Sequence, residues 1–206
     1  MRALLATDRE CGKLGEDTML RAPATKVNQE DRLWCGAACC EYILKMLGVY
    51  NRESHKQQNI MNAVQTLGMV DWCGSTPASI ADYILNASRG RKQGVQIYRL
   101  LSPNEYAGRL HIWALKHALE KFEEWGQNKP FTEDQAVLRF VTPQEFFSLS
   151  SHFVVETHFF DGPGQQFQLM DPDPDEPIYQ GVNFDDWLRV KGTQYQSTSL
   201  DLVITG

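Results

Sequence analysis

The sequence lacks the features that mark several large classes of protein. None of its apolar runs approaches the length of a membrane span, and its basic residues are dispersed instead of forming the positive face that nucleic acids require. It has no internal repeat and no low-complexity tract. Its 206 residues, 42% of them hydrophobic, suffice to bury a core, and the formal net charge is −6. We therefore expect a folded protein that does not span a membrane or bind nucleic acid.

The amino-terminal segment also lacks the pattern of a cleaved signal peptide, because charged residues interrupt its one short apolar patch. The number of cysteines is odd, and their spacing fits neither a disulfide framework nor a paired zinc site. They are Cys11, Cys35, Cys39, Cys40 and Cys73. We expect reduced thiols, no cofactor, no metal ion and synthesis in a cytoplasm. Secretion by a route without a cleaved signal stays open, and the oligomeric state is unknown.

The first half of the chain carries the spacing of helices. Residues 1–27 show no periodicity and predict an irregular arm, whereas apolar residues recur at helical spacing from Cys35 to Leu47 and stop at Gly48. This pattern predicts a helix over 35–47 with Cys35 at its amino end. Cap and stop signals predict further helices within residues 75–90, 102–126, 142–149 and 183–190.

The second half changes to the spacing of strands, over residues 136–141, 152–160, 166–171 and 200–205. The turn sequence DGPG at 161–164 joins the second and third of these into a hairpin. Because helices come first and antiparallel strands follow, we expect an α+β fold with segregated lobes. The expected domain covers residues 28–206, with a helical lobe over about 28–130 and a sheet lobe over about 131–206.

Three residues of this fold have the arrangement of a nucleophilic centre. The dipole of a helix favours the thiolate of a cysteine at its amino end, which is where Cys35 lies. His152 opens one strand of the hairpin and Asp171 ends the other, so a regular hairpin brings their side chains together. Taken alone, Cys35 could equally be a buried structural cysteine of the helix. Taken alone, His152 is more often a structural histidine than a catalytic one. Together with Asp171, they favour a catalytic interpretation.

Gln29 is the candidate donor for the negative charge that acyl transfer develops on the substrate oxygen. Its amide and the backbone N–H of Cys35 can both meet that oxygen if the intervening loop folds back. A glutamine in a polar loop is usually solvated, so this prediction depends on the other residues of the site.

Other residues fit these roles less well. His158 shares the face of His152 but lies at the turn end of the hairpin, away from Asp171. The acidic run DPDPDEP alternates like a calcium loop, but Glu176 and Val182 stand where that loop needs Gly and Glu. The remaining histidines are expected at the surface or in interfaces, and they are His55, His111 and His117.

These motifs resemble the papain-like cysteine proteases. The resemblance lies in Gln29, the six-residue step to Cys35, CGAAC opening a helix, and SHFVVE followed by LMDPD. GSTPASIADYI and NFDDWL are also similar to helices of the compact bacterial branch, which includes bacteriocin-leader peptidases and proteases injected by plant-pathogenic bacteria. The resemblance spans roughly residues 27–190 and implies that Cys35 is the nucleophile, His152 the general base and acid, Asp171 its orienter and Gln29 the oxyanion donor.

The expected function is therefore a cysteine peptidase that cleaves a peptide or protein substrate through a thioester, as a bacterial effector or toxin would. An acyltransferase or deamidase with the same triad is an alternative, because the chemistry up to the acyl-enzyme is shared. A binding module on a papain-like frame without turnover is a second alternative. No transporter domain follows the motifs, so we do not expect a role tied to an ABC exporter.

Overall fold

The computed structural model of the chain describes residues 25–66, 75–89, 96–99, 135–143, 152–161, 164–191, 195–197 and 201–205. Three predicted segments lie wholly or mostly outside these ranges: the arm over 1–27 and the helices over 102–126 and 142–149. Cys11, Cys73, His111 and His117 also lie outside them.

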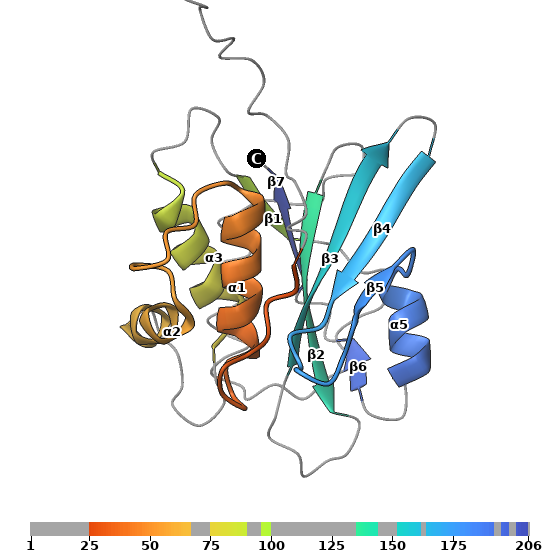
Figure 1. Ribbon diagram of the computed structural model, residues 1–206, viewed down its shortest axis with the longest axis horizontal. Helices are drawn as coiled ribbons and strands as arrows, with labels where there is room; N and C mark the ends of the chain where they lie inside the picture. Colours follow the sequence, from red (N-terminus) through yellow and green to blue (C-terminus); the bar gives the residue numbers. More distant parts are fainter. Residues whose placement is uncertain are drawn as a thin grey trace, which may run out of the picture.

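Three helices form one layer of the molecule, and they are α1 (Cys35–Met46), α2 (Gln57–Thr66) and α3 (Pro77–Ala87) (Figure 1). Helix α1 confirms the predicted helix and begins at Cys35, and Gly48 beyond its end takes the left-handed φ of 68°. Helix α3 confirms the second prediction, because the side chain of Thr76 caps it by accepting from the Ser79 N–H at 3.1 Å. Helix α2 was not predicted.

The described strands form one antiparallel sheet in the order β1-β7-β2-β3-β4-β5, with β6 paired to β2. They are β1 (Gln96–Arg99), β2 (Gln135–Pro143), β3 (His152–Asp161), β4 (Gly164–Met170), β5 (Ile178–Gln180), β6 (Tyr195–Ser197) and β7 (Leu202–Thr205). Strands β2, β3, β4 and β7 confirm the four predicted strands, and Asp161 pairs with Gly164 across the predicted hairpin turn. The short strands β1, β5 and β6 were not predicted. The α+β prediction is confirmed.

The sheet buries both of its faces. Phe153 and Val155 of β3 belong to the larger core under α1, α2 and α3, whereas Val154 belongs to a smaller core with Phe184 and Trp187 of α5 (Phe184–Lys191). This alternation follows from the period of two along a strand. In Figure 1, α5 accordingly lies beside β5 and β6, on the other side of the sheet from α1. No helix in the described ranges is long and apolar enough to cross a membrane.

A glycine lets the first turn of α1 approach both α3 and the sheet. A Cβ atom on Gly36 would lie 2.0 Å from the hydroxyl oxygen of Ser75 and 3.3 Å from Cδ2 of Phe153. Ser75 precedes the Thr76 cap of α3, and Phe153 follows His152 in β3. The absence of a side chain at Gly36 therefore sets how closely the amino end of α1 packs on its neighbours.

We predict that Gly36→Ala destabilises the protein by about 1 to 2 kcal/mol, because overpacking at the buried contact outweighs the better helix propensity of alanine. Equilibrium denaturation measures this loss. Removing the Ser75 hydroxyl should relieve most of the clash, so Gly36→Ala should cost less in a Ser75→Ala background than in the wild type. A gain in stability from Gly36→Ala alone would contradict the packing described for α1.

Candidate active site

Cys35 is the first residue of α1 and is 7% exposed. Trp34 is the N-cap residue, and it makes no side-chain capping hydrogen bond to the helix. The amino-terminal turn therefore keeps its positive dipole end unshielded by a cap side chain, next to the sulfur of Cys35. This is the placement that stabilises a thiolate.

The neighbouring cysteines of α1 have a different character. Cys39 and Cys40 are fully buried, as the sequence predicts for small core residues. Burial raises the pKa of both thiols well above its ordinary value, and the Cys39 thiol donates to the carbonyl oxygen of Phe153 at 3.3 Å. A protonated and inaccessible thiol is a poor nucleophile. Within α1, Cys39 and Cys40 therefore lack the environment of a reactive cysteine.

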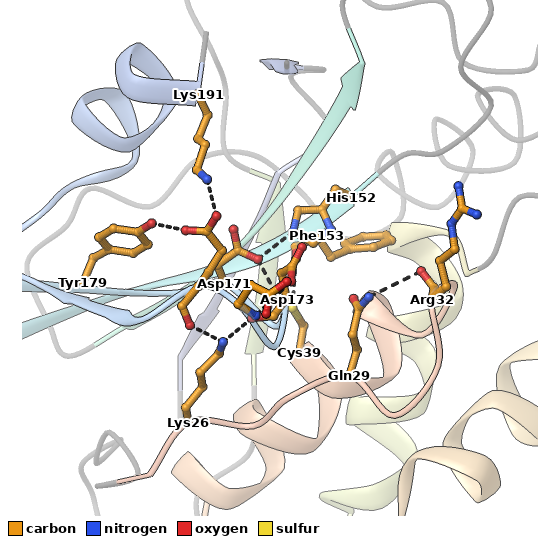
Figure 2. A network of polar contacts seen from close by, with 12 residues as sticks. Lys26, Gln29, Arg32, Cys39, His152, Phe153, Asp171, Asp173, Tyr179 and Lys191 are labelled. Atoms are coloured by element: carbon orange, nitrogen blue, oxygen red, sulfur yellow. Dashed lines mark hydrogen bonds and ion pairs between the residues drawn. The ribbon is translucent and has the colours of Figure 1, made fainter. Parts of the chain in front are cut away.

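His152 joins Cys35 to Asp171. Its Nε2 lies 2.8 Å from Oδ1 of Asp171 (Figure 2). Its side chain also forms a hydrogen bond with Cys35. Burial lowers the pKa of His152, but the hydrogen bonds to Asp171 and Cys35 outweigh it and raise the pKa to about 10. Because Nε2 faces Asp171, the geometry leaves Nδ1 for the thiol. The imidazole of His152 thus lies between two groups that raise its pKa.

Asp171 is itself fixed by the loop that follows β4. It is 2% exposed, and its Oδ1 also accepts from the backbone N–H of Asp173 at 3.0 Å. The Lys26 ammonium group donates to the backbone carbonyls of Asp173 and Glu176, and the Glu176 carboxylate pairs with Lys191 (Figure 2). These contacts hold the acidic loop as a rigid turn with the Asp171 carboxylate aimed at His152. No pattern in the sequence indicates the part that Lys26 plays in these contacts.

Gln29 lies on the loop that leads into α1, and this loop is docked on the Asp171 loop. The Gln29 backbone N–H donates to the carbonyl of Pro172 at 2.8 Å. Its side-chain amide is weakly held, because Nε2 lies 3.5 Å from the carbonyl of Arg32 and the buried Oε1 has no hydrogen-bond partner. The Nε2 group, which is the donor of this amide, is thus bound only weakly within the protein.

The rival histidines of the described ranges have other surroundings. His158 is buried in β3, pairs with Phe167 of β4, and places Nε2 3.5 Å from Glu156. Six residues along a strand separate it from His152 by about 20 Å. His55 accepts from the Asn51 N–H at 2.9 Å through Nδ1. Neither contacts Asp171. Among the described residues, no group of three or more His, Cys, Asp or Glu side chains is arranged to hold a metal ion.

Comparison with known proteins gives similarity to solved structures only. No protein-family model matches the chain, and no curated protein matches it. Among solved structures, the chain is similar to a double glycine motif protease from an AMS/PCAT transporter in complex with the leader peptide. The similarity covers 90% of this chain and 91% of that chain at 17% sequence identity, with a TM-score of 0.42. Because the sequence identity and the TM-score are this low, the functional argument rests on the geometry of the site and not on this similarity.

We predict that iodoacetamide at mildly acidic pH labels Cys35 before Cys39 and Cys40, because a thiolate next to His152 reacts where buried thiols do not. Intact mass spectrometry with peptide mapping measures the order. In His152→Ala, the labelling of Cys35 at this pH should slow strongly, whereas a denatured sample should label all three residues. Equal labelling of Cys35 and Cys40 in the folded protein would contradict an activated nucleophile.

Proposed function

We propose that the protein is a cysteine peptidase in which Cys35, His152 and Asp171 act as a triad on a peptide or protein substrate. The observation that carries this proposal is the placement of His152, whose ring bonds Asp171 on one side and Cys35 on the other. The three side chains come from a helix start, a strand start and a loop, and all are nearly buried. A purely structural role would not require a weakly exposed thiol at the end of such a chain of hydrogen bonds.

In the proposed reaction, the Cys35 thiolate attacks the carbonyl carbon of the scissile bond and forms a tetrahedral intermediate. The His152 imidazolium then gives its Nδ1 proton to the leaving amine as the C–N bond breaks, which leaves a thioester on Cys35. His152, now neutral, removes a proton from a water molecule that attacks the thioester. The acid product leaves, and the thiolate and imidazolium are restored. Asp171 keeps the imidazole in one orientation through both steps.

The charge on the tetrahedral oxygen would be met by the amino end of α1 and by Gln29. Backbone N–H groups at a helix start point along its axis, and this end of α1 has no side-chain cap. The weakly held amide of Gln29 is the second donor that we assign. Its loop is kept beside the triad by the bond to Pro172. The backbone donors of α1 are fixed before the substrate binds, and such donors stabilise the transition state more than the substrate.

The same triad suits an acyltransferase or a deamidase, because these differ from a peptidase only in the group that leaves or that accepts the acyl chain. A binding module without turnover is favoured less, because all four residues expected for catalysis are present. We further propose synthesis in a cytoplasm and a role as a bacterial effector or toxin, with neither cofactor nor metal ion in the reaction. Incubation with a peptide library, read by mass spectrometry, separates hydrolysis from deamidation and from transfer to an added amine.

We predict that Cys35→Ala and His152→Ala each abolish cleavage in this library, and that the double variant is no worse than either, because triad members act as a unit. Asp171→Asn should lower kcat without eliminating it, since its role is to orient the imidazole. Circular dichroism serves as the control for folding. Full activity in Cys35→Ala would exclude the proposed mechanism, and an unchanged kcat in Asp171→Asn would leave that residue a structural role only.

We predict that Gln29→Ala lowers kcat by about a hundred- to a thousandfold, the usual effect of losing one oxyanion donor. Alkylation of Cys35 by a haloacetamide forms no oxyanion, so its rate should barely change. Gln57→Ala is the matched control, because Gln57 holds the same loop by donating to the Asn28 carbonyl at 2.8 Å and accepting from the Glu30 N–H at 2.9 Å. That variant should lower both rates together.

Three outcomes for Gln29→Ala have different meanings. A loss in kcat alone supports the oxyanion assignment. Equal losses in both rates would show that Gln29 only positions the helix, and no loss in either would show a solvated loop residue.

A further inference from the structure

A column of aromatic rings leads away from His152 on the face of the sheet that α5 covers. The imidazole of His152 stacks on Tyr195, with the ring centroids 5.5 Å apart and the planes 18° from parallel. Tyr195 stacks in turn on Trp187 at 6.0 Å and 15°, and Trp187 on Phe184 at 5.9 Å and 23°. These separations are those of offset-stacked aromatic pairs. The triad mechanism makes no use of this column.

Strand pairing places Tyr195 beside the histidine. Val141 of β2 pairs with His152 on one side and with Ser197 of β6 on the other, and Tyr195 pairs with Pro143 two residues further along. Tyr195 is half-buried, whereas Trp187 behind it is 1% exposed. The ring of Tyr195 is therefore backed by a rigid core residue and cannot retreat from the imidazole without disturbing α5.

The face of an aromatic ring carries negative charge density and attracts a cation placed over it. The charged or titratable groups that act on His152 are the Cys35 thiol from α1 and the Asp171 carboxylate from the loop after β4. Tyr195 approaches from β6, and the ring contact places its π face against the imidazole. Burial raises the pKa of the Tyr195 phenol, with Asp171 and Cys35 acting in the same direction, so the ring stays neutral near pH 7.

We propose that Tyr195 is a positioning residue for His152: its ring fixes the plane of the imidazole and stabilises the imidazolium form. Stabilising the imidazolium also stabilises its ion pair with the Cys35 thiolate. Asp171 orients the imidazole within its plane by a hydrogen bond, and Tyr195 restrains rotation out of that plane. The consequence for catalysis rests on the proposed function, whereas the effect on the charge of His152 does not.

Titration of the His152 ring by NMR tests this proposal in the wild type, Tyr195→Phe and Tyr195→Leu, with His152→Ala used to assign the signal. Tyr195→Phe keeps the ring and should keep the pKa of His152. Tyr195→Leu should lower that pKa by about one unit, the size expected from losing one partly desolvated cation–π contact.

Phe167→Leu is the matched control, because Phe167 makes an edge contact with His158 at 4.9 Å and lies outside the column. This change should leave the titration of His152 unaltered. An unchanged pKa in folded Tyr195→Leu would overturn the proposal, and so would an equal drop in Tyr195→Phe.

If Tyr195→Leu does not fold, fluorinated phenylalanines at position 195 keep the shape of the ring while weakening its negative face. The pKa of His152 should then fall with each added fluorine, and a constant pKa across the series would overturn the proposal. Because the titration needs no substrate, it separates the two proposals. If the pKa of His152 shifts in Tyr195→Leu but no peptide is cleaved, the peptidase proposal is refuted and the role of Tyr195 is supported. If peptides are cleaved but the pKa does not shift, the peptidase proposal is supported and the role of Tyr195 is refuted.

Discussion

The close approach of α1 to β3 is the constraint on which the site depends. Small residues line the contact, since a Cβ atom on Gly36 would already lie 3.3 Å from the Phe153 ring and the Cys39 thiol bonds the carbonyl of that same residue. His152 directly precedes Phe153, just as Cys35 directly precedes Gly36. The tight contact thus brings the two residues of the proposed ion pair together one step from where helix and strand touch. A side chain at Gly36 would press on Ser75 first and on the Phe153 ring next, so the helix start that carries Cys35 would have to move.

Burying the proposed ion pair raises an energetic problem that the surrounding loop addresses. Cys35, His152 and Asp171 are 7%, 9% and 2% exposed, and charges with so little contact to water are costly unless each is paired and hydrogen-bonded. His152 lies between Cys35 and the Asp171 carboxylate, and Asp171 accepts from the Asp173 N–H in addition to its bond with His152. Lys26 places a positive charge at the backbone carbonyls of the same loop. Its hydrogen bonds also connect this loop to the segment that precedes α1. The loop therefore supplies both the orientation of the carboxylate and part of its electrostatic compensation.

The sequence predicts the parts of this arrangement that arise locally. The helix start at Cys35 and the cap at Thr76 are each determined by a few neighbouring residues. The hairpin turn brings His152 and Asp171 together because they are only 19 residues apart. Helix α2 was missed although Ile60, Met61 and Val64 follow helical spacing, because no cap residue announces it. Tyr195 could not have been found in this way. Its three-residue strand has no periodic signal, and only its pairing with β2 brings it to His152.

Strand β3 connects the two faces of the sheet within a few residues. Its odd positions, Phe153 and Val155, anchor the helical layer that carries Cys35. The Glu156 carboxylate, on the opposite face, accepts from the Phe184 N–H at the start of α5 at 2.9 Å and pairs with Arg139 of β2. Helix α5 in turn carries Trp187, which backs the Tyr195 ring against His152. Strand β3 therefore places the imidazole of His152 and sets the distance of that imidazole from the Cys35 thiol. It also fixes α5, the helix that supports the Tyr195 ring. The catalytic proposal and the role of Tyr195 thus depend on the same ten residues, from His152 to Asp161.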